Sequence, residues 1–138
     1  ASVGYGFGGT VALELARSGA VILGTVSFHG GLHNPSPDDA GRIRGDVLIL
    51  QGTQDPMVPD AEIDAFEAEM DAAGARYEVI RFSGAAHAFS NRRSDGWNIP
   101  GAGFNQRAAD LSAIQVGLFL QRTLGGPTPG RARITDGE

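Results

Sequence analysis

The distribution of apolar positions predicts a series of short buried strands. Residues 20–28 form a nearly continuous apolar run, which is typical of a strand covered on both faces. Residues 46–50 form a second apolar run, and residues 77–82 form a third strand in which apolar and polar side chains alternate. A shorter stretch at the start of the chain leads directly into a glycine-rich turn and adds a brief strand before it.

Between these strands, the spacing of apolar residues changes to that of amphipathic helices. Residues 10–18 predict a short helix that Gly19 ends. Residues 60–73 predict a second helix that Gly74 ends, and residues 107–124 predict a third. The apolar positions expected to face the core are Ile63, Phe66 and Met70 in the second helix, and Leu111, Ile114, Val116, Leu118, Leu120 and Leu124 in the third.

The order strand, helix, strand, strand, helix, strand, helix predicts an α/β fold with a mostly parallel sheet and helices on its faces. Two longer segments, 29–45 and 83–105, contain glycine, proline and polar residues and are expected to be loops. A loop as long as the second is usually functional in a compact domain. Residues 1–124 form one predicted domain, and residues 125–138 form a Gly/Pro/Arg-rich tail that is expected to be disordered.

Composition narrows the possible function classes. The chain has 138 residues, and all 11 of its Lys or Arg residues are arginine. Its 16 acidic residues outnumber them and give a net charge of −5, so no clustered basic surface for nucleic acid is expected. It contains no cysteine, which excludes disulfides, cysteine zinc sites and thiol catalysis. No apolar run approaches the roughly 18 residues of a membrane span. We therefore expect no membrane partner, and the missing targeting signal predicts a cytoplasmic location.

The glycine-rich turn at the start of the chain fits two motifs. Gly4, Gly6 and Gly9 match the G-x-G-x-x-G pattern of dinucleotide-binding turns. That pattern requires an acidic residue about 20 positions later, at the end of the next strand. The next acids, Asp38 and Asp39, lie beyond a proline-containing loop. The nucleotide interpretation therefore fails its own requirement, and no cofactor is expected.

The same turn also fits the nucleophile elbow G-x-Nu-x-G, a strained turn from a strand into a helix. Gly4 and Gly8 occupy the glycine positions, where close packing of strand and helix is expected to leave no room for a Cβ. The nucleophile position is then Gly6, which has no side chain. The elbow is predicted without its attacking atom.

Two further loops carry an acid and a base. Asp55 follows the strand at 46–50, and His87 follows the strand at 77–82. Each has a simpler interpretation, because aspartate is common in turns before proline and a single loop histidine need not be catalytic. However, the carboxyl ends of parallel strands meet at one edge of a sheet. The chain order elbow, acid, base is also that of α/β-hydrolases, in which the acid orients the imidazole and the imidazole accepts the proton of the nucleophile.

Other residues of chemical interest have simpler explanations. His29 ends a buried strand and is expected to pack or to anchor a loop, and His33 is expected to face solvent. Neither has a partner at metal-ligand spacing, so no metal site is predicted. Trp97 lies in the long loop, where it either anchors the loop or forms a wall of a pocket.

These motifs together resemble the dienelactone hydrolase family. The stretch Gly4-Tyr5-Gly6-Phe7-Gly8-Gly9 is similar to the family's G-Y-C-F-G-G elbow. The stretches 51–59 and 87–91 resemble its acid and histidine loops, and 100–105 resembles the segment before its last helix. The resemblance covers residues 1 to about 124 and corresponds to the C-terminal half of a family domain, so the N-terminal strands are expected to be missing.

The resemblance implies an α/β-hydrolase fold and a Cys-His-Asp enzyme that hydrolyses carboxylic esters or lactones. It implies that Asp55 is the acid, that His87 is the base and that the Phe7 N–H is one oxyanion donor. Gly6 stands where the family has its cysteine, so the chain as written is expected to be inactive. Asn91 stands where the family has a substrate-binding arginine, with Arg92 next to it, so dienelactone itself is not the expected substrate.

An alternative remains open at this stage. The chain could be a non-catalytic α/β-hydrolase-fold module that binds a small acid or a partner protein, and Gly6 favours this interpretation. The retained Asp55 and His87 favour an enzyme that acts on a small ester or lactone. Missing upstream strands would also leave open sheet edges, which predicts self-association.

Overall fold

A parallel sheet forms the centre of the molecule. The computed structural model describes residues 1–125, and its four strands lie in the order β1-β2-β3-β4, with each neighbouring pair parallel. The strands are β1 (Ser2–Tyr5), β2 (Gly24–Phe28), β3 (Asp46–Gly52) and β4 (Tyr77–Phe82). The predicted parallel α/β sheet is therefore confirmed. The predicted disordered tail lies outside the described residues except for Gly125, which caps the last helix.

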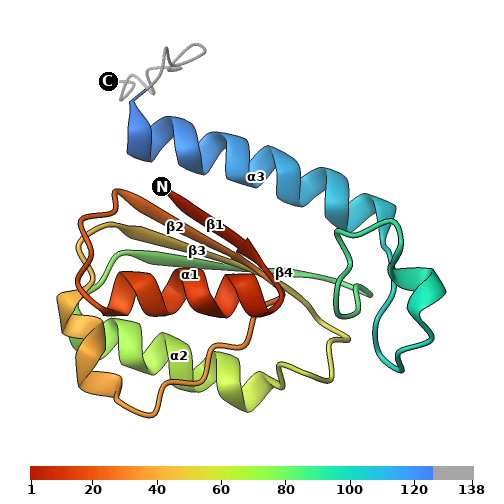
Figure 1. Cartoon of the computed structure of the whole chain (residues 1–138), viewed down its shortest axis with the longest axis horizontal. Coiled ribbons are helices and arrows are strands. Elements are labelled where there is room, and N and C mark those ends of the chain that lie inside the picture. The colour runs from red at the N-terminus through yellow and green to blue at the C-terminus, as the bar shows by residue number, and fades with distance from the viewer. Residues whose placement is uncertain (126–138) are drawn as a thin grey trace, which may run out of the picture.

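Helices cover both faces of the sheet. The helices α1 (Phe7–Arg17) and α2 (Asp60–Ala73) pack on one face, and α3 (Gln106–Leu124) crosses the other (Figure 1). Two short 3-10 helices, η1 (Pro37–Arg42) and η2 (Ser94–Trp97), lie within the segments expected to be loops. The long segment after β4 folds over the end of the sheet to which the strands point (Figure 1).

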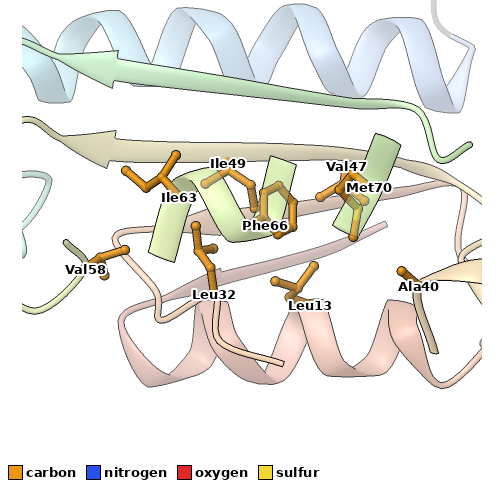
Figure 2. Close-up of a cluster of buried hydrophobic side chains, with 9 residues drawn as sticks. All are labelled: Leu13, Leu32, Ala40, Val47, Ile49, Val58, Ile63, Phe66 and Met70. Carbon is orange, nitrogen blue, oxygen red and sulfur yellow. The ribbon is translucent and has the colours of Figure 1, made fainter. Parts of the chain in front are cut away.

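One core layer fills the space between the sheet and the α1–α2 face. Val47 and Ile49 of β3 point into this layer toward the helices (Figure 2). The residues expected to form the buried face of α2 do so, because Ile63, Phe66 and Met70 are all buried there. The full buried cluster comprises Leu13, Leu32, Ala40, Val47, Ile49, Val58, Ile63, Phe66 and Met70.

A second core layer lies between the sheet and α3, where Leu48 and Leu50 point because side chains alternate along a strand. Phe119 is the large buried side chain of α3, whereas Ile114 and Leu118, expected to face the core, are 58% and 56% exposed. The burial of Phe119 depends on Gly24, because a Cβ at that position would lie 2.9 Å from the Phe119 ring. The close approach of α3 to this glycine selects the helix face that is buried.

Several element boundaries differ from those predicted. Helix α1 begins at Phe7 rather than at residue 10, because the chain turns into the helix directly at Gly6. Strand β2 begins at Gly24 rather than at residue 20, because its neighbour β3 begins only at Asp46, the partner of Gly24. Residues 20–23 therefore lie outside the sheet even though they are mostly apolar.

The sheet has an edge at β1 and another at β4. On β1, Val3 is 43% and Tyr5 is 57% exposed. Self-association through these edges stays a prediction. None of the helices within residues 1–125 is long and apolar enough to cross a lipid bilayer.

Candidate active site

The turn between β1 and α1 has the geometry of a nucleophile elbow. Gly6 lies at the junction with φ 55° and ψ −124°, a left-handed conformation that favours glycine. Its N–H donates a hydrogen bond of 2.9 Å to the Phe28 carbonyl of β2, which fixes the turn against the sheet. A Cβ built on Gly6 would meet no atom within 4 Å. The predicted nucleophile position therefore has open space around it, and it has no side chain.

The glycines around this position are only partly those that the motif predicts. A Cβ on Gly4 would lie 2.0 Å from the Gly8 carbonyl oxygen, so the expected lack of space at Gly4 is confirmed. The same expectation for Gly8 is wrong, because a Cβ there would meet nothing within 4 Å. Gly9 takes that role instead, since its Cβ would lie 2.4 Å from the Ser27 hydroxyl oxygen of β2. The helix touches the sheet one residue later than expected.

Asp55 and His87 form a hydrogen-bonded pair. The His87 Nδ1 atom lies 2.9 Å from Oδ2 of Asp55. The other carboxylate oxygen accepts a hydrogen bond of 2.8 Å from the N–H of Met57. Asp55 is buried, whereas the side chain of His87 is 19% exposed. The buried carboxylate therefore orients the imidazole and leaves its Nε2 atom for proton transfer.

Backbone contacts hold the acid and histidine loops together. The N–H of Gln54 donates to the Ala85 carbonyl at 2.9 Å, and a Cβ on Gly52 would lie 2.2 Å from that carbonyl oxygen. The N–H of His87 donates to the Gly101 carbonyl, also at 2.9 Å. Glycine at position 52 thus permits the close approach that brings residues 55 and 87 into contact.

A cavity of about 500 Å³ opens next to this pair. It brings together Gly6 and His87 with Asn91 and Arg92, the residues for which the sequence suggested substrate contacts. Arg92 also packs over the Phe104 ring, with its Cζ atom 5.1 Å from the ring centroid. Trp97 is one of the cavity walls. The lining residues are Tyr5, Gly6, His29, His87, Ala88, Ser90, Asn91, Arg92 and Trp97.

Phe7, the predicted oxyanion donor, offers the site its backbone rather than its side chain. The side chain is 83% exposed and does not line the cavity. As the first residue of α1, Phe7 has an N–H group without an intrahelical acceptor. The positive end of the helix dipole lies at the same place, next to Gly6. A developing oxyanion beside Gly6 would meet both.

His29 lies at the site, although its position in the sequence predicted only a packing or loop-anchoring role. The anchoring role is confirmed, because its Nε2 atom lies 2.9 Å from the Ser90 hydroxyl in the histidine loop. In addition, His29 lines the cavity and its ring centroid lies 5.2 Å from that of His87. Burial, and secondarily the nearby His87, lowers the pKa of His29 from 6.5 to about 4. Its position directly after a strand was the available signal.

His33 is exposed, as expected. Within residues 1–125, no group of three or more His, Cys, Asp or Glu side chains is arranged to hold a metal ion. The chemistry that the described residues offer is proton transfer by an oriented imidazole beside a helix N-terminus.

The comparisons with known proteins fit this geometry. The sequence profile of the dienelactone hydrolase family matches residues 1–124. The chain belongs to the dienelactone hydrolase family. No protein with a curated description matches it.

Solved structures of this family and of related hydrolases have the same fold. A structure named m3DLH is 36% identical, with a TM-score of 0.83. A dienelactone hydrolase-like promiscuous phosphotriesterase, P91, from metagenomic libraries is 32% identical, with a TM-score of 0.82. Esterase 2 of Thermogutta terrifontis, solved as its paraoxon-phosphorylated form, shares the fold at 23% identity and a TM-score of 0.60.

The chain spans about half the length of these structures. The matches cover 88% of the chain and 50% of m3DLH, 88% of the chain and 51% of P91, and 93% of the chain and 55% of the esterase. The expected α/β-hydrolase-like fold and the family resemblance are both confirmed.

Proposed function

We propose that the site of this family member is built for the hydrolysis of carboxylic esters or lactones by acyl transfer to water, with Asp55 and His87 as its acid–base pair and Gly6 at the position of the missing nucleophile. The observation on which the proposal rests is the 2.9 Å contact between these two side chains beside a cavity that Gly6 also lines. A surface ion pair would not require a buried carboxylate behind an accessible imidazole. An acyl-transfer site requires that arrangement, because the imidazole must accept a proton and then return it.

Each residue has a role in this proposal. His87 accepts the proton of the attacking group through Nε2 and donates it to the leaving alkoxide. Asp55 holds the imidazole in the required tautomer and stabilises its positive charge. The Phe7 N–H donates to the oxyanion of the tetrahedral intermediate. Asn91 and Arg92 contact the substrate from the cavity wall.

The attacking group of a Cys-His-Asp site would be a thiolate at position 6, and Gly6 does not supply one. Removing the nucleophile of a hydrolase triad can lower turnover by about a millionfold. We therefore propose that the chain as written has negligible esterase activity. The substrate partner would be a small-molecule ester or lactone. The predicted cytoplasmic location stays a prediction.

The proposal is tested by restoring the nucleophile. The Gly6→Cys variant of the intact protein should become acetylated when it is treated with phenyl acetate. Mass spectrometry of the peptide that contains position 6 measures this acetylation. The open space at Gly6 accommodates the new side chain, although its positive φ makes the turn strained. Adding His87→Gln should remove the acetylation, because the thiol then has no base.

Gly8→Cys provides a matched control. Gly8 lies two residues away at an exposed position where a Cβ meets nothing, and it does not line the cavity. Its thiol should react only as slowly as that of a free cysteine. Equal acetylation at positions 6 and 8, or acetylation at position 6 that does not depend on His87, would contradict the proposal.

A second substrate class has one observation in its favour. The 32%-identical structure P91 is described as a promiscuous phosphotriesterase. A phosphotriester is uncharged, like an ester, and attack on it also places negative charge on an oxygen. Paraoxon should therefore phosphorylate Gly6→Cys if the site accepts both classes, and acetylation without phosphorylation would restrict the site to acyl groups.

The non-catalytic alternative is favoured by Gly6 alone. A module that only binds a small acid or a partner protein has no need for the Asp55–His87 contact. If Gly6→Cys folds and its thiol remains unacylated, this binding role becomes the better proposal.

A further inference from the structure

The elbow keeps space for a group that the chain does not provide. Gly6 lines the cavity together with His87, and a Cβ built on Gly6 meets no atom within 4 Å. We call the part of the cavity beside the Gly6 Cα the Gly6 recess. The recess begins where a nucleophilic side chain would project from an elbow. The cavity of which it is a part has a volume of about 500 Å³, which leaves room for a side-chain-sized molecule.

The base beside this recess is retained. His87 is hydrogen-bonded to buried Asp55 through Nδ1, so its orientation does not depend on a nucleophile at position 6. Among the described residues that line the cavity, Tyr5 and Ser90 carry hydroxyl groups. Ser90 is paired with His29, and Tyr5 stacks on the Phe28 ring at a centroid distance of 4.4 Å. An attacking group from solution would therefore find a positioned base.

The surroundings favour a thiol, rather than a cationic amine or water, as that group. Within residues 1–125, the cavity is lined by the cation Arg92 and by no carboxylate, which disfavours amines in their cationic form. A thiol is a stronger nucleophile than water and a far stronger acid, so a positioned base deprotonates it more readily. A small alkyl thiol also has the shape of the cysteine side chain that the elbow would otherwise carry.

We propose that the Gly6 recess binds a small uncharged thiol from solution and that His87 activates it to take the acyl group of an ester. This inference rests on the proposed ester chemistry of the same site. The thiol S–H proton passes to His87, sulfur bonds to the carbonyl carbon, and the ester C–O bond breaks. His87 then protonates the departing alkoxide. An ester and a thiol thus give a thioester and an alcohol, with no change of oxidation state.

The test uses the protein with Gly6 in place, phenyl acetate as the ester and methanethiol as the thiol. Acetyl methyl thioester is measured by chromatography. We expect its rate of formation to saturate with methanethiol and to fall about 100-fold in His87→Gln, the lower range of what a general base contributes. A rate that rises linearly with thiol and is the same in His87→Gln is solution chemistry and would overturn the proposal.

Gly6→Ala tests the recess itself. Its methyl group occupies the start of the recess and should abolish the thiol-dependent rate. Gly8→Ala, which adds the same methyl group at an exposed position, should leave that rate unchanged. Because alanine at φ 55° is strained, circular dichroism of Gly6→Ala must first show a folded protein. Undiminished thioester formation by folded Gly6→Ala would place the thiol elsewhere and overturn the inference.

The outcomes separate this inference from the proposed function. If Gly6→Cys is acetylated in a His87-dependent manner while methanethiol has no effect on the Gly6 protein, the inference fails and the proposed function stands. If neither reaction occurs, both fail. His87-dependent release of acetate that is as fast without thiol as with it would assign the recess to water and would overturn the thiol proposal.

Discussion

The rings of His29 and His87 meet edge to face, with centroids 5.2 Å apart and planes inclined by 65°. The two residues come from different loops, after β2 and after β4, and both line the cavity. His29 adopts a positive φ of 39°, which is uncommon for a residue with a Cβ. A neutral imidazole at this place supports His87 sterically without opposing the positive charge that His87 acquires when it accepts a proton.

The buried His29 should make stability depend on pH. Burial, and secondarily His87, lowers its pKa in the folded protein from 6.5 to about 4. Between these two pKa values the unfolded chain binds the proton and the folded protein does not. The contribution of His29 to the free energy of unfolding is therefore fully present above pH 6.5 and is lost as the pH is lowered toward 4. The loss should reach about 3 kcal/mol near pH 4.

Urea unfolding at pH 7.5 and 4.5 measures this loss. The His29→Phe variant keeps a ring at the position and removes the titrating group, so its stability should change less over the same pH range. His33→Phe, a substitution at the exposed histidine, should retain the pH dependence of the unmodified protein. The same pH dependence in all three proteins would contradict the assignment to His29.

The elbow glycines should differ sharply in their tolerance of a methyl group. Gly4→Ala would place a Cβ 2.0 Å from the Gly8 carbonyl oxygen, so we expect the variant not to fold or to lose several kcal/mol. Gly8→Ala introduces a better helix former without a clash and should stabilise the protein by about 0.5–1 kcal/mol. Thermal melts of both variants test this contrast. Equal destabilisation would contradict the close approach of Gly4 to the Gly8 carbonyl oxygen.

The buried Arg17 should depend strongly on its carboxylate partner. Its guanidinium donates to both oxygens of Glu69, at 2.6 and 2.9 Å, and to the Leu32 carbonyl at 2.9 Å. This contact joins α1, which carries the elbow at its start, to α2. Glu69→Ala leaves a charge that is only 1% exposed without its main partner and should cost about 3 kcal/mol or more.

An exposed ion pair serves as the control for Glu69→Ala. The side chain of Arg76, which contacts Asp46 at 2.6 Å, is 77% exposed. Arg76→Ala should therefore cost less than about 1 kcal/mol. Similar losses in the two variants, measured by urea unfolding, would mean that the Arg17–Glu69 pair is not the interaction that joins α1 and α2.

Asp55 should control reactivity at a restored nucleophile. In the Gly6→Cys background, Asp55→Asn keeps the size of the side chain and removes the charge behind His87, so acetylation should slow by about 10⁴-fold, as for the equivalent change in a serine protease triad. Asp60→Asn changes an exposed aspartate, paired with Arg81, and should have little effect. Rapid-quench measurements of the acetylated fraction compare the two. Equal rates would remove Asp55 from the mechanism.

The sequence by itself predicted those features that depend on local pattern. The bounds 60–73 of α2 and 77–82 of β4 match the structure, because helical and strand periodicity and the terminating Gly74 are local signals. Asp55 and His87 could be paired from sequence because the carboxyl ends of parallel strands converge on one edge. The elbow at Gly6 was visible as glycine spacing.

Only the tertiary structure decided which surfaces meet. The contact of α1 with Ser27 selects Gly9 rather than Gly8 as the second tight glycine, and the approach of α3 to Gly24 buries Phe119. His29 enters the site only because the histidine loop folds back so that Ser90 reaches it. Such contacts join residues far apart in the chain, and their identity depends on the distance between packed elements, which no local periodicity encodes.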